Sequence, residues 1–155
     1  MNCKDMKIIT HLRKDARMPI TKMSKKTQIP VSTIFDRIKT YENNIIVRHT
    51  TLLDFQKLGY STRANIQLKV DKDDRENIKT YLVNNCFVNT VYKINNGFDF
   101  MLEGIFKDLQ NMDLFMEQLE DRFRILDHKA FFIIEDIKRE CFMADPLLSI
   151  NPTSS

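Results

Sequence analysis

Side chains that can bind a polyanion are concentrated in the first third of the sequence. Residues 1–55 contain 11 Lys or Arg against 5 Asp or Glu, a net charge of +6, whereas residues 56–155 carry 13 basic and 16 acidic groups, a net charge of −3. Lysine and arginine bind phosphate, and arginine and short hydroxyl side chains also hydrogen-bond to the edges of bases. The asymmetry favours a basic part that faces a polyanion, although two solvated surfaces would explain the charge alone equally well.

Residues that could perform catalysis or bind a metal are scattered. The three histidines, His11, His49 and His128, fall in different parts of the sequence, and no HExxH, GxSxG or P-loop pattern occurs. The three cysteines form no CxxC pair, which argues against a zinc site and a disulfide framework. No apolar run approaches the ~20 residues that span a bilayer. We therefore expect neither an enzyme nor a protein that binds a metal, a cofactor or a membrane.

Three helices are predicted to position the basic side chains. Asp5 can cap the first helix, because apolar residues follow it at helical spacing. Pro19 interrupts that pattern, and a second helix is expected to begin around it, since proline is tolerated in a first turn. The run from Gln28 to Pro30 ends the second helix, and a third is expected at residues 31–42.

This order of helices is typical of a helix-turn-helix, whose second short helix enters the major groove of DNA by its amino-terminal end. Ser32 and Thr33 stand at that end and can reach base edges, and Arg37 can reach guanine or phosphate. The side chains predicted to contact DNA are Arg17, Thr21, Lys22, Lys25, Lys26, Ser32, Thr33, Asp36, Arg37 and Lys39. Residues 45–52 are β-prone and could form a short strand or wing. A three-helix bundle that binds a protein is the alternative, and the charge favours DNA.

The acidic remainder is predicted to form a βαββαβ, ferredoxin-like domain, which makes the fold class α+β. Strands are expected at residues 60–71, 86–94, 98–107 and 128–138, and helices at residues 72–84 and from Asp108 to Phe123. The Met/Phe stripe of the second helix is expected to be core. Apolar residues at 131–134 lie on both sides of the last strand, so we expect a partner sheet in a homodimer to cover the open face.

The sequence resembles the Lrp/AsnC (feast/famine) family of transcription regulators over residues 5–140. The resemblance rests on Asp15-Ala16-Arg17 after the first helix, on the KMSKKT helix and on the Ser-Thr-x-x-x-Arg-Ile-Lys core at 32–39. In the second part, NGFDFML at 96–102 is similar to the family's Gly-x-aromatic-Asp hairpin, and HKAFFIIEDIK at 128–138 resembles its closing strand. The sequence departs from the family at Gln28, where glycine is common, and at Pro30, where a capping hydroxyl residue is common.

The resemblance implies a cytoplasmic dimer that can assemble further, commonly to octamers, and that binds specific DNA sequences near promoters. It also implies a small effector, typically an amino acid, near the hairpin at Gly97 and Asp99; alternatively, Gly97 only makes the turn and Asp99 caps it. The expected domains are residues 1–50 for DNA binding, 51–59 as a connecting strand or linker, 60–140 for oligomerisation and effector binding, and 141–155 as a tail. A ligand-sensing or protein-interaction module of the same fold is the alternative. Lrp-like haem-precursor decarboxylases share the architecture, but their basic and histidine-containing stretches are not found.

Overall fold

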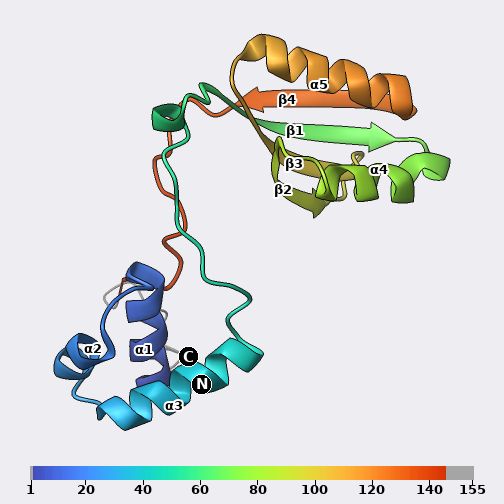
Figure 1. Cartoon of the computed structure of the whole chain (residues 1–155). Coiled ribbons are helices and arrows are strands. Elements are labelled where there is room, and N and C mark those ends of the chain that lie inside the picture. The colour runs from blue at the N-terminus through green and yellow to red at the C-terminus, as the bar shows by residue number, and fades with distance from the viewer. Residues whose placement is uncertain (1, 146–155) are drawn as a thin grey trace. The chain divides into compact units, whose positions relative to one another are not determined.

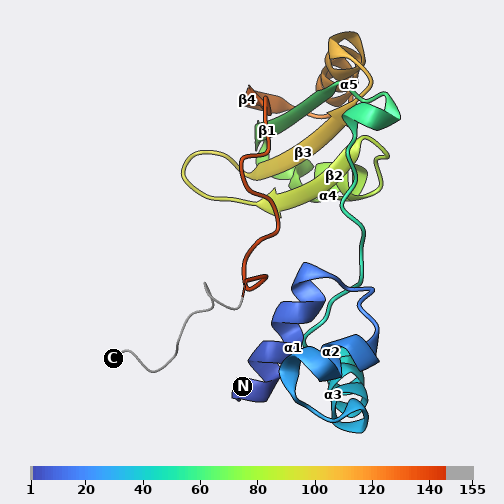
Figure 2. The ribbon, with the colours of Figure 1, turned by 90° about the vertical axis from the view of Figure 1, so that its left-hand side faces the viewer.

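The computed structural model describes residues 2–145, which fold as two units (Figures 1 and 2). One unit contains the described residues up to Leu52 together with those from Ile137 onward, and the other runs from Leu53 to Asp136. Most of the expected tail, residues 146–155, lies outside the described residues. Arg13 donates hydrogen bonds to the backbone oxygens of Glu140 at 3.0 Å and Phe142 at 3.1 Å, so the chain after Ile137 lies against the first helix.

The first unit contains the three predicted helices, α1 (Cys3–Lys14), α2 (Ile20–Thr27) and α3 (Val31–Asn44). The prediction that Asp5 caps α1 was wrong, because the cap is Asn2, whose side chain accepts the Asp5 amide at 2.9 Å. The Asp5 carboxylate accepts the Asn2 amide in return, also at 2.9 Å. This reciprocal capping box places a negative charge in the first turn of α1, where it favours the helix dipole.

Prolines start α2 and α3, and a residue in the left-handed backbone conformation separates the two helices. Pro19 and Pro30 occupy the caps of α2 and α3, which confirms the predicted starts. Gln28 adopts the left-handed conformation at φ 59°, which glycine adopts with less strain. Its side-chain Nε2 donates to the Lys25 oxygen at 3.0 Å, and Ser24 Oγ donates to the Ile29 oxygen at 2.6 Å. Side-chain hydrogen bonds thus stabilise a turn that has no glycine.

Each helix contributes to the core of the first unit. Ile8 of α1, Met23 of α2 and Ile34 of α3 are fully buried, and Met18, Ile29 and Tyr41 complete the cluster.

The predicted strand over residues 45–52 is not formed, since the chain from residue 46 to residue 54 has no regular structure. A β-prone segment needs a neighbouring strand to pair with, and the described part of this unit offers none.

The second unit is a four-stranded antiparallel sheet with its helices on one face, as Figure 2 shows, and the predicted element order is confirmed. Its elements are β1 (Thr62–Val70), α4 (Arg75–Val83), β2 (Val88–Lys93), β3 (Phe100–Phe106), α5 (Leu109–Arg122) and β4 (Ile125–Phe132). Two short 3-10 turns, η1 (Gln56–Leu58) and η2 (Lys72–Asp74), precede β1 and α4. The strand order is β2-β3-β1-β4.

Alternation along β1 determines which face of the sheet is buried. Ala64, Ile66, Leu68 and Val70 are buried against the helices, while the residues between them lie on the open face. The predicted Met/Phe stripe of α5 is core at Met112, Phe115, Met116 and Leu119. Gly104 of β3 is also buried, and the Phe106 ring lies directly over it.

The last strand differs from its prediction in position, and its apolar residues are exposed in the single chain. β4 begins at Ile125 rather than at residue 128 and ends at Phe132, because its pairing partner β1 extends only from Val70 to Ala64 in this ladder. Phe131 is 53% exposed and Phe132 is 50% exposed, so this chain alone does not cover both faces of the strand.

Candidate nucleic-acid interface

The exposed side of α3 carries polar and charged side chains at helical spacing. Ser32, Asp36 and Lys39 are exposed, while Thr33 is half-buried near the helix start. Ile34 and Tyr41 hold the opposite side of α3 in the core, which directs the exposed side chains to solvent. This arrangement can present hydroxyl, carboxylate and ammonium groups to a groove of DNA.

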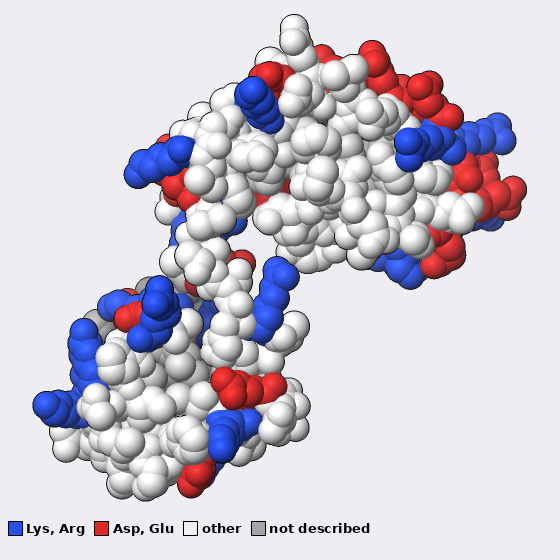
Figure 3. Space-filling model, viewed as in Figure 1, with Lys and Arg blue, Asp and Glu red and all other residues white. Residues whose placement is uncertain are grey.

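The lysines predicted to bind phosphate lie together on the neighbouring helix. Lys22, Lys25 and Lys26 are exposed on α2, and Arg17 and Thr21 are exposed at its start. In Figure 3, Lys and Arg side chains project over α2 on the left-hand side of this unit. None of the ion pairs found among residues 2–145 includes a lysine of α2. Their charge is therefore available to a polyanion.

Arg37 is separated from the other predicted DNA contacts. Its Nη1 pairs with Asp5 Oδ1 at 2.6 Å, and the Tyr41 hydroxyl donates to the same oxygen. The Asp5 side chain is only 9% exposed, whereas that of Arg37 is 40% exposed. The structure thus places the Arg37 guanidinium between α3 and α1, where it compensates a buried charge.

Hydrogen bonding determines the ionisation of this cluster. The hydrogen bond from Tyr41 and that from the Asn2 amide lower the pKa of Asp5 against the opposing effect of burial. Burial and the hydrogen bond to Asp5 raise the pKa of Tyr41 to about 12. The carboxylate is therefore ionised at neutral pH, and the phenol and the guanidinium both remain donors to it.

Two apolar residues on the exposed side of α3 were not among the predicted contacts. Val31 is 44% exposed and Phe35 is 46% exposed, and the ammonium of Lys39 lies 4.5 Å from the centre of the Phe35 ring. The sequence already indicated that Phe35 would be exposed, because it falls outside the apolar stripe of Ile34 and Tyr41.

The two predicted effector residues lie at the hairpin between β2 and β3, and each has a role in the structure of the hairpin itself. Gly97 has φ 93°, a conformation that favours glycine, so the turn itself requires it. Asp99 pairs with Arg75 of α4 at 2.7 Å through Oδ1, and its Oδ2 accepts the Val70 amide of β1 at 2.9 Å. Both carboxylate oxygens therefore connect the hairpin to neighbouring elements.

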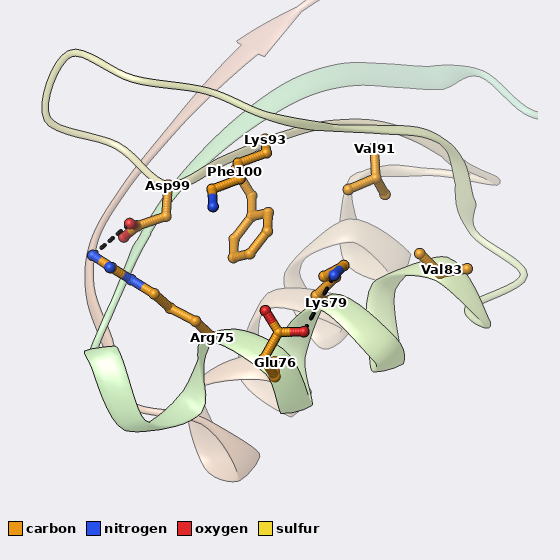
Figure 4. A pocket seen from close by; sticks show the side chains of 8 residues that line it. All are labelled: Arg75, Glu76, Lys79, Val83, Val91, Lys93, Asp99 and Phe100. Carbon is orange, nitrogen blue, oxygen red and sulfur yellow. Dashed lines mark hydrogen bonds and ion pairs between the residues drawn. The ribbon is translucent and has the colours of Figure 1, made fainter.

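A shallow pocket of about 190 Å³ lies beside this hairpin, against α4 (Figure 4). Arg75, Lys79 and Lys93 supply positive charge to its lining, and Phe100 lies at its base. The Arg75–Asp99 pair stands at one edge of the pocket, and Lys79 pairs with Glu76 at 3.2 Å. Two of the three cations are thus already engaged by carboxylates of the same unit.

Within residues 2–145, no group of three or more His, Cys, Asp or Glu side chains is arranged to hold a metal ion. None of the helices in that range has the length and apolar character needed to cross a membrane.

Comparison with known proteins links the chain to transcriptional regulators. The family model for winged helix-turn-helix DNA-binding domains matches residues 1–44. A regulator from Pyrococcus abyssi, "HTH-type transcriptional regulator FL11", is 30% identical over 114 residues, which cover 73% of this chain and 76% of that protein. The glutamate uptake regulatory protein of Zymomonas mobilis is 25% identical over 146 residues, covering 92% of this chain and 89% of that one.

Solved structures share the fold across both units. The Neisseria meningitidis regulator NMB0573, solved as a complex with L-Met, has a TM-score of 0.84 at 21% identity, covering 90% of this chain and 93% of its own. Bacillus subtilis LrpC has a TM-score of 0.81 at 22% identity, covering 89% and 97%. Escherichia coli AsnC has a TM-score of 0.79 at 14% identity, covering 90% and 95%.

These comparisons and the geometry of the first unit agree. The Pyrococcus abyssi relative is named as a regulator of transcription, and the matched family model describes a DNA-binding domain over the three helices described above. The chain belongs to the Lrp/AsnC family and is a DNA-binding helix-turn-helix regulator of transcription.

Proposed function

We propose that the chain acts in the cytoplasm as a homodimer that inserts two copies of α3 into successive major grooves on one face of a duplex. Such a dimer would read half-sites that lie about one helical turn, roughly 34 Å, apart. The observation that carries this proposal is the exposed side of α3, with Ser32, Asp36 and Lys39. It lies next to the lysines of α2, which enter none of the ion pairs found among residues 2–145.

The side chains divide by role according to their exposure. The lysines of α2 bind phosphates and supply most of the affinity, together with Arg17 and Thr21. Ser32, Thr33 and Asp36 stand near the start of α3 and discriminate between bases. Arg37 positions α3 through its ion pair with Asp5 rather than by contacting DNA.

The open face of the sheet is the proposed dimer surface. Phe131 is paired with Asn65 of β1, and Tyr92 with Met101 of β3, so these side chains share the face opposite the helices. Phe131 and Tyr92 are each more than half exposed. A second copy of the same sheet would cover them, because two sheets pack face to face with interdigitating side chains.

Polar groups on that face are paired within the chain. Arg63 Nε donates to Glu103 Oε1 at 2.5 Å, and its Nη1 pairs with Asp136 at 2.7 Å. Asn89 donates to the other oxygen of Glu103. Charges that are compensated in this way cost less to bury against a partner, which supports an interface there.

An amino-acid-like effector is proposed to bind the second unit near the hairpin at Gly97. The related Neisseria meningitidis regulator was solved with L-Met, which supports a ligand of this class. Because Asp99 is occupied by Arg75 and Val70, it holds the hairpin in place, and the exposed backbone at Gly97 is the group left for direct contact. Dimers can assemble further, up to octamers, through this region.

The test is selection of duplexes from a random pool by the full chain, followed by footprinting and titration of affinity against salt. Lys25→Ala should weaken binding to all sequences alike and reduce the slope of log K against log [salt] by about one unit per protomer. Lys72→Ala removes the same charge from the second unit and should leave the slope unchanged. A chain that binds no duplex at low ionic strength would contradict the proposal.

A further inference from the structure

Phe35 is an aromatic side chain that the core of its unit does not use. Ile34 and Tyr41 of the same helix are buried, and Ile38 packs partly against them, whereas Phe35 is 46% exposed. Val31, one turn earlier, is 44% exposed and extends the same apolar strip. A phenylalanine left in water forgoes the stabilisation that burial would bring, so folding of α3 does not explain its presence there.

The surroundings of Phe35 are those of the proposed reading side of α3. Ser32 lies one turn before it, Asp36 directly after it and Lys39 one turn later. The Lys39 ammonium lies 4.5 Å from the ring centre, a cation–π contact that limits the ring's motion. An ammonium at this place can also reach a phosphate beside the groove that the ring faces.

We propose that Phe35 determines specificity by contacting the 5-methyl group of a thymine in each half-site. The inference rests on the proposed function, in which α3 occupies the major groove. A phenyl ring has no hydrogen-bonding group, and the thymine methyl is the one apolar group that base edges present in that groove. A cytosine at the same place presents only a C5–H there, so the ring would lose its apolar contact.

The size of the effect follows from the group that is contacted. Removing one methyl group from an apolar contact lowers affinity about fourfold, so a dimer that loses the contact in both half-sites should bind about fifteenfold more weakly. The remaining Watson–Crick pairs and groove acceptors stay in place when thymine is replaced by uracil. Deoxyuridine is therefore a probe of the methyl contact alone.

The experiment measures the affinity of the full chain for its selected duplex, with each thymine replaced in turn by deoxyuridine. The affinity of the wild-type protein should fall about fourfold when deoxyuridine replaces thymine at one position, the same by symmetry in each half-site. Phe35→Ala and Phe35→Gln should bind the thymine duplex more weakly and should no longer distinguish thymine from deoxyuridine at that position. Phe142→Ala, which removes an exposed phenylalanine of the same unit outside α3, should retain the full discrimination.

Two results would overturn the inference while leaving the proposed function intact: a wild-type protein indifferent to every deoxyuridine substitution, or Phe35 variants with undiminished discrimination. Thermal unfolding of each variant accompanies the titrations, and Phe35→Gln retains good helix propensity should Phe35→Ala unfold. Failure of the wild-type chain to bind any duplex would refute the proposed function, and this inference with it.

Discussion

Replacing Arg37 with alanine separates two roles for this residue. The sequence predicts that Arg37 reads a base, whereas the structure places its guanidinium 2.6 Å from Asp5. Asp5 also accepts hydrogen bonds from Tyr41 and the Asn2 amide. Arg37→Ala would leave a buried carboxylate with two neutral donors and without its ion-pair partner, so we expect a loss of stability in the first unit.

The stability lost in Arg37→Ala should lie between the values for buried and for exposed ion pairs. Breaking a buried pair by removing one partner costs about 3–5 kcal/mol, and an exposed pair is worth about 0–1 kcal/mol. The Asp5 side chain is 9% exposed and that of Arg37 is 40% exposed, so solvent screens part of the interaction. We expect a loss of about 1–2 kcal/mol, equivalent to a fall in Tm of roughly 5–15 °C for a small domain.

Two measurements on the full chain separate these roles. Thermal unfolding monitored by circular dichroism gives the stability, and DNA affinity is measured at a temperature where the variant is folded. Arg37→Ala should unfold at lower temperature yet retain its sequence preference once folded. Arg17→Ala removes an exposed arginine of the same unit and should lower affinity without changing Tm. The reasoning is refuted if Arg37→Ala keeps its Tm and loses about 1–3 kcal/mol of binding at the selected site, as a bidentate contact to guanine would.

Three further predictions concern the two units. Folding lowers the pKa of Asp5, so its carboxylate stabilises the folded state above the ordinary pKa of aspartate, about 3.9. This contribution is lost as the pH falls through the lower pKa of the folded state. Asp5→Asn should therefore flatten the dependence of Tm on pH between roughly 2 and 5. Gly104→Ala should destabilise the second unit by about 1–3 kcal/mol in urea unfolding, since the added Cβ would lie 2.6 Å from Phe106 Cζ; an unchanged midpoint would mean that the ring moves freely. Phe131→Asp should shift the chain towards monomer in sedimentation, whereas Leu114→Asp, on the exposed side of α5, should not.

Much of the fold could be predicted from local patterns. The alternation from Ala64 to Val70 and the stripe from Met112 to Leu119 identified the buried faces, because burial follows strand and helix periodicity directly. The limits of β4 could not be predicted in this way, since its apolar residues run on past Phe132 and only the ladder with β1 determines where pairing stops. The cap of α1 was misplaced because Asn2 and Asp5 are both capping residues, three positions apart.

The candidate interface was predictable where it depends on exposure and less so where it depends on contacts. Lys25 and Lys26 were expected to face solvent from helical spacing alone, and they do. The partner of Arg37 is Asp5, 32 positions earlier, and no local pattern connects the two. Phe35 was overlooked because an apolar residue is expected in a core, although its phase on α3 excluded it from the stripe of Ile34 and Tyr41.

Ion pairs within each unit indicate which charged side chains are available to a ligand and which have a structural role. Arg37 was predicted from its place on the third helix to reach a base, and Asp99 by resemblance to contact an effector, yet each lies in an ion pair inside its own unit. Either would have to leave that partner before it could bind a ligand, so the cost of breaking the pair would be subtracted from the affinity gained. The lysines of α2 have no competing carboxylate among the described ion pairs. Affinity for DNA should therefore depend on α2, while Arg37 and Asp99 determine where α3 and the hairpin lie.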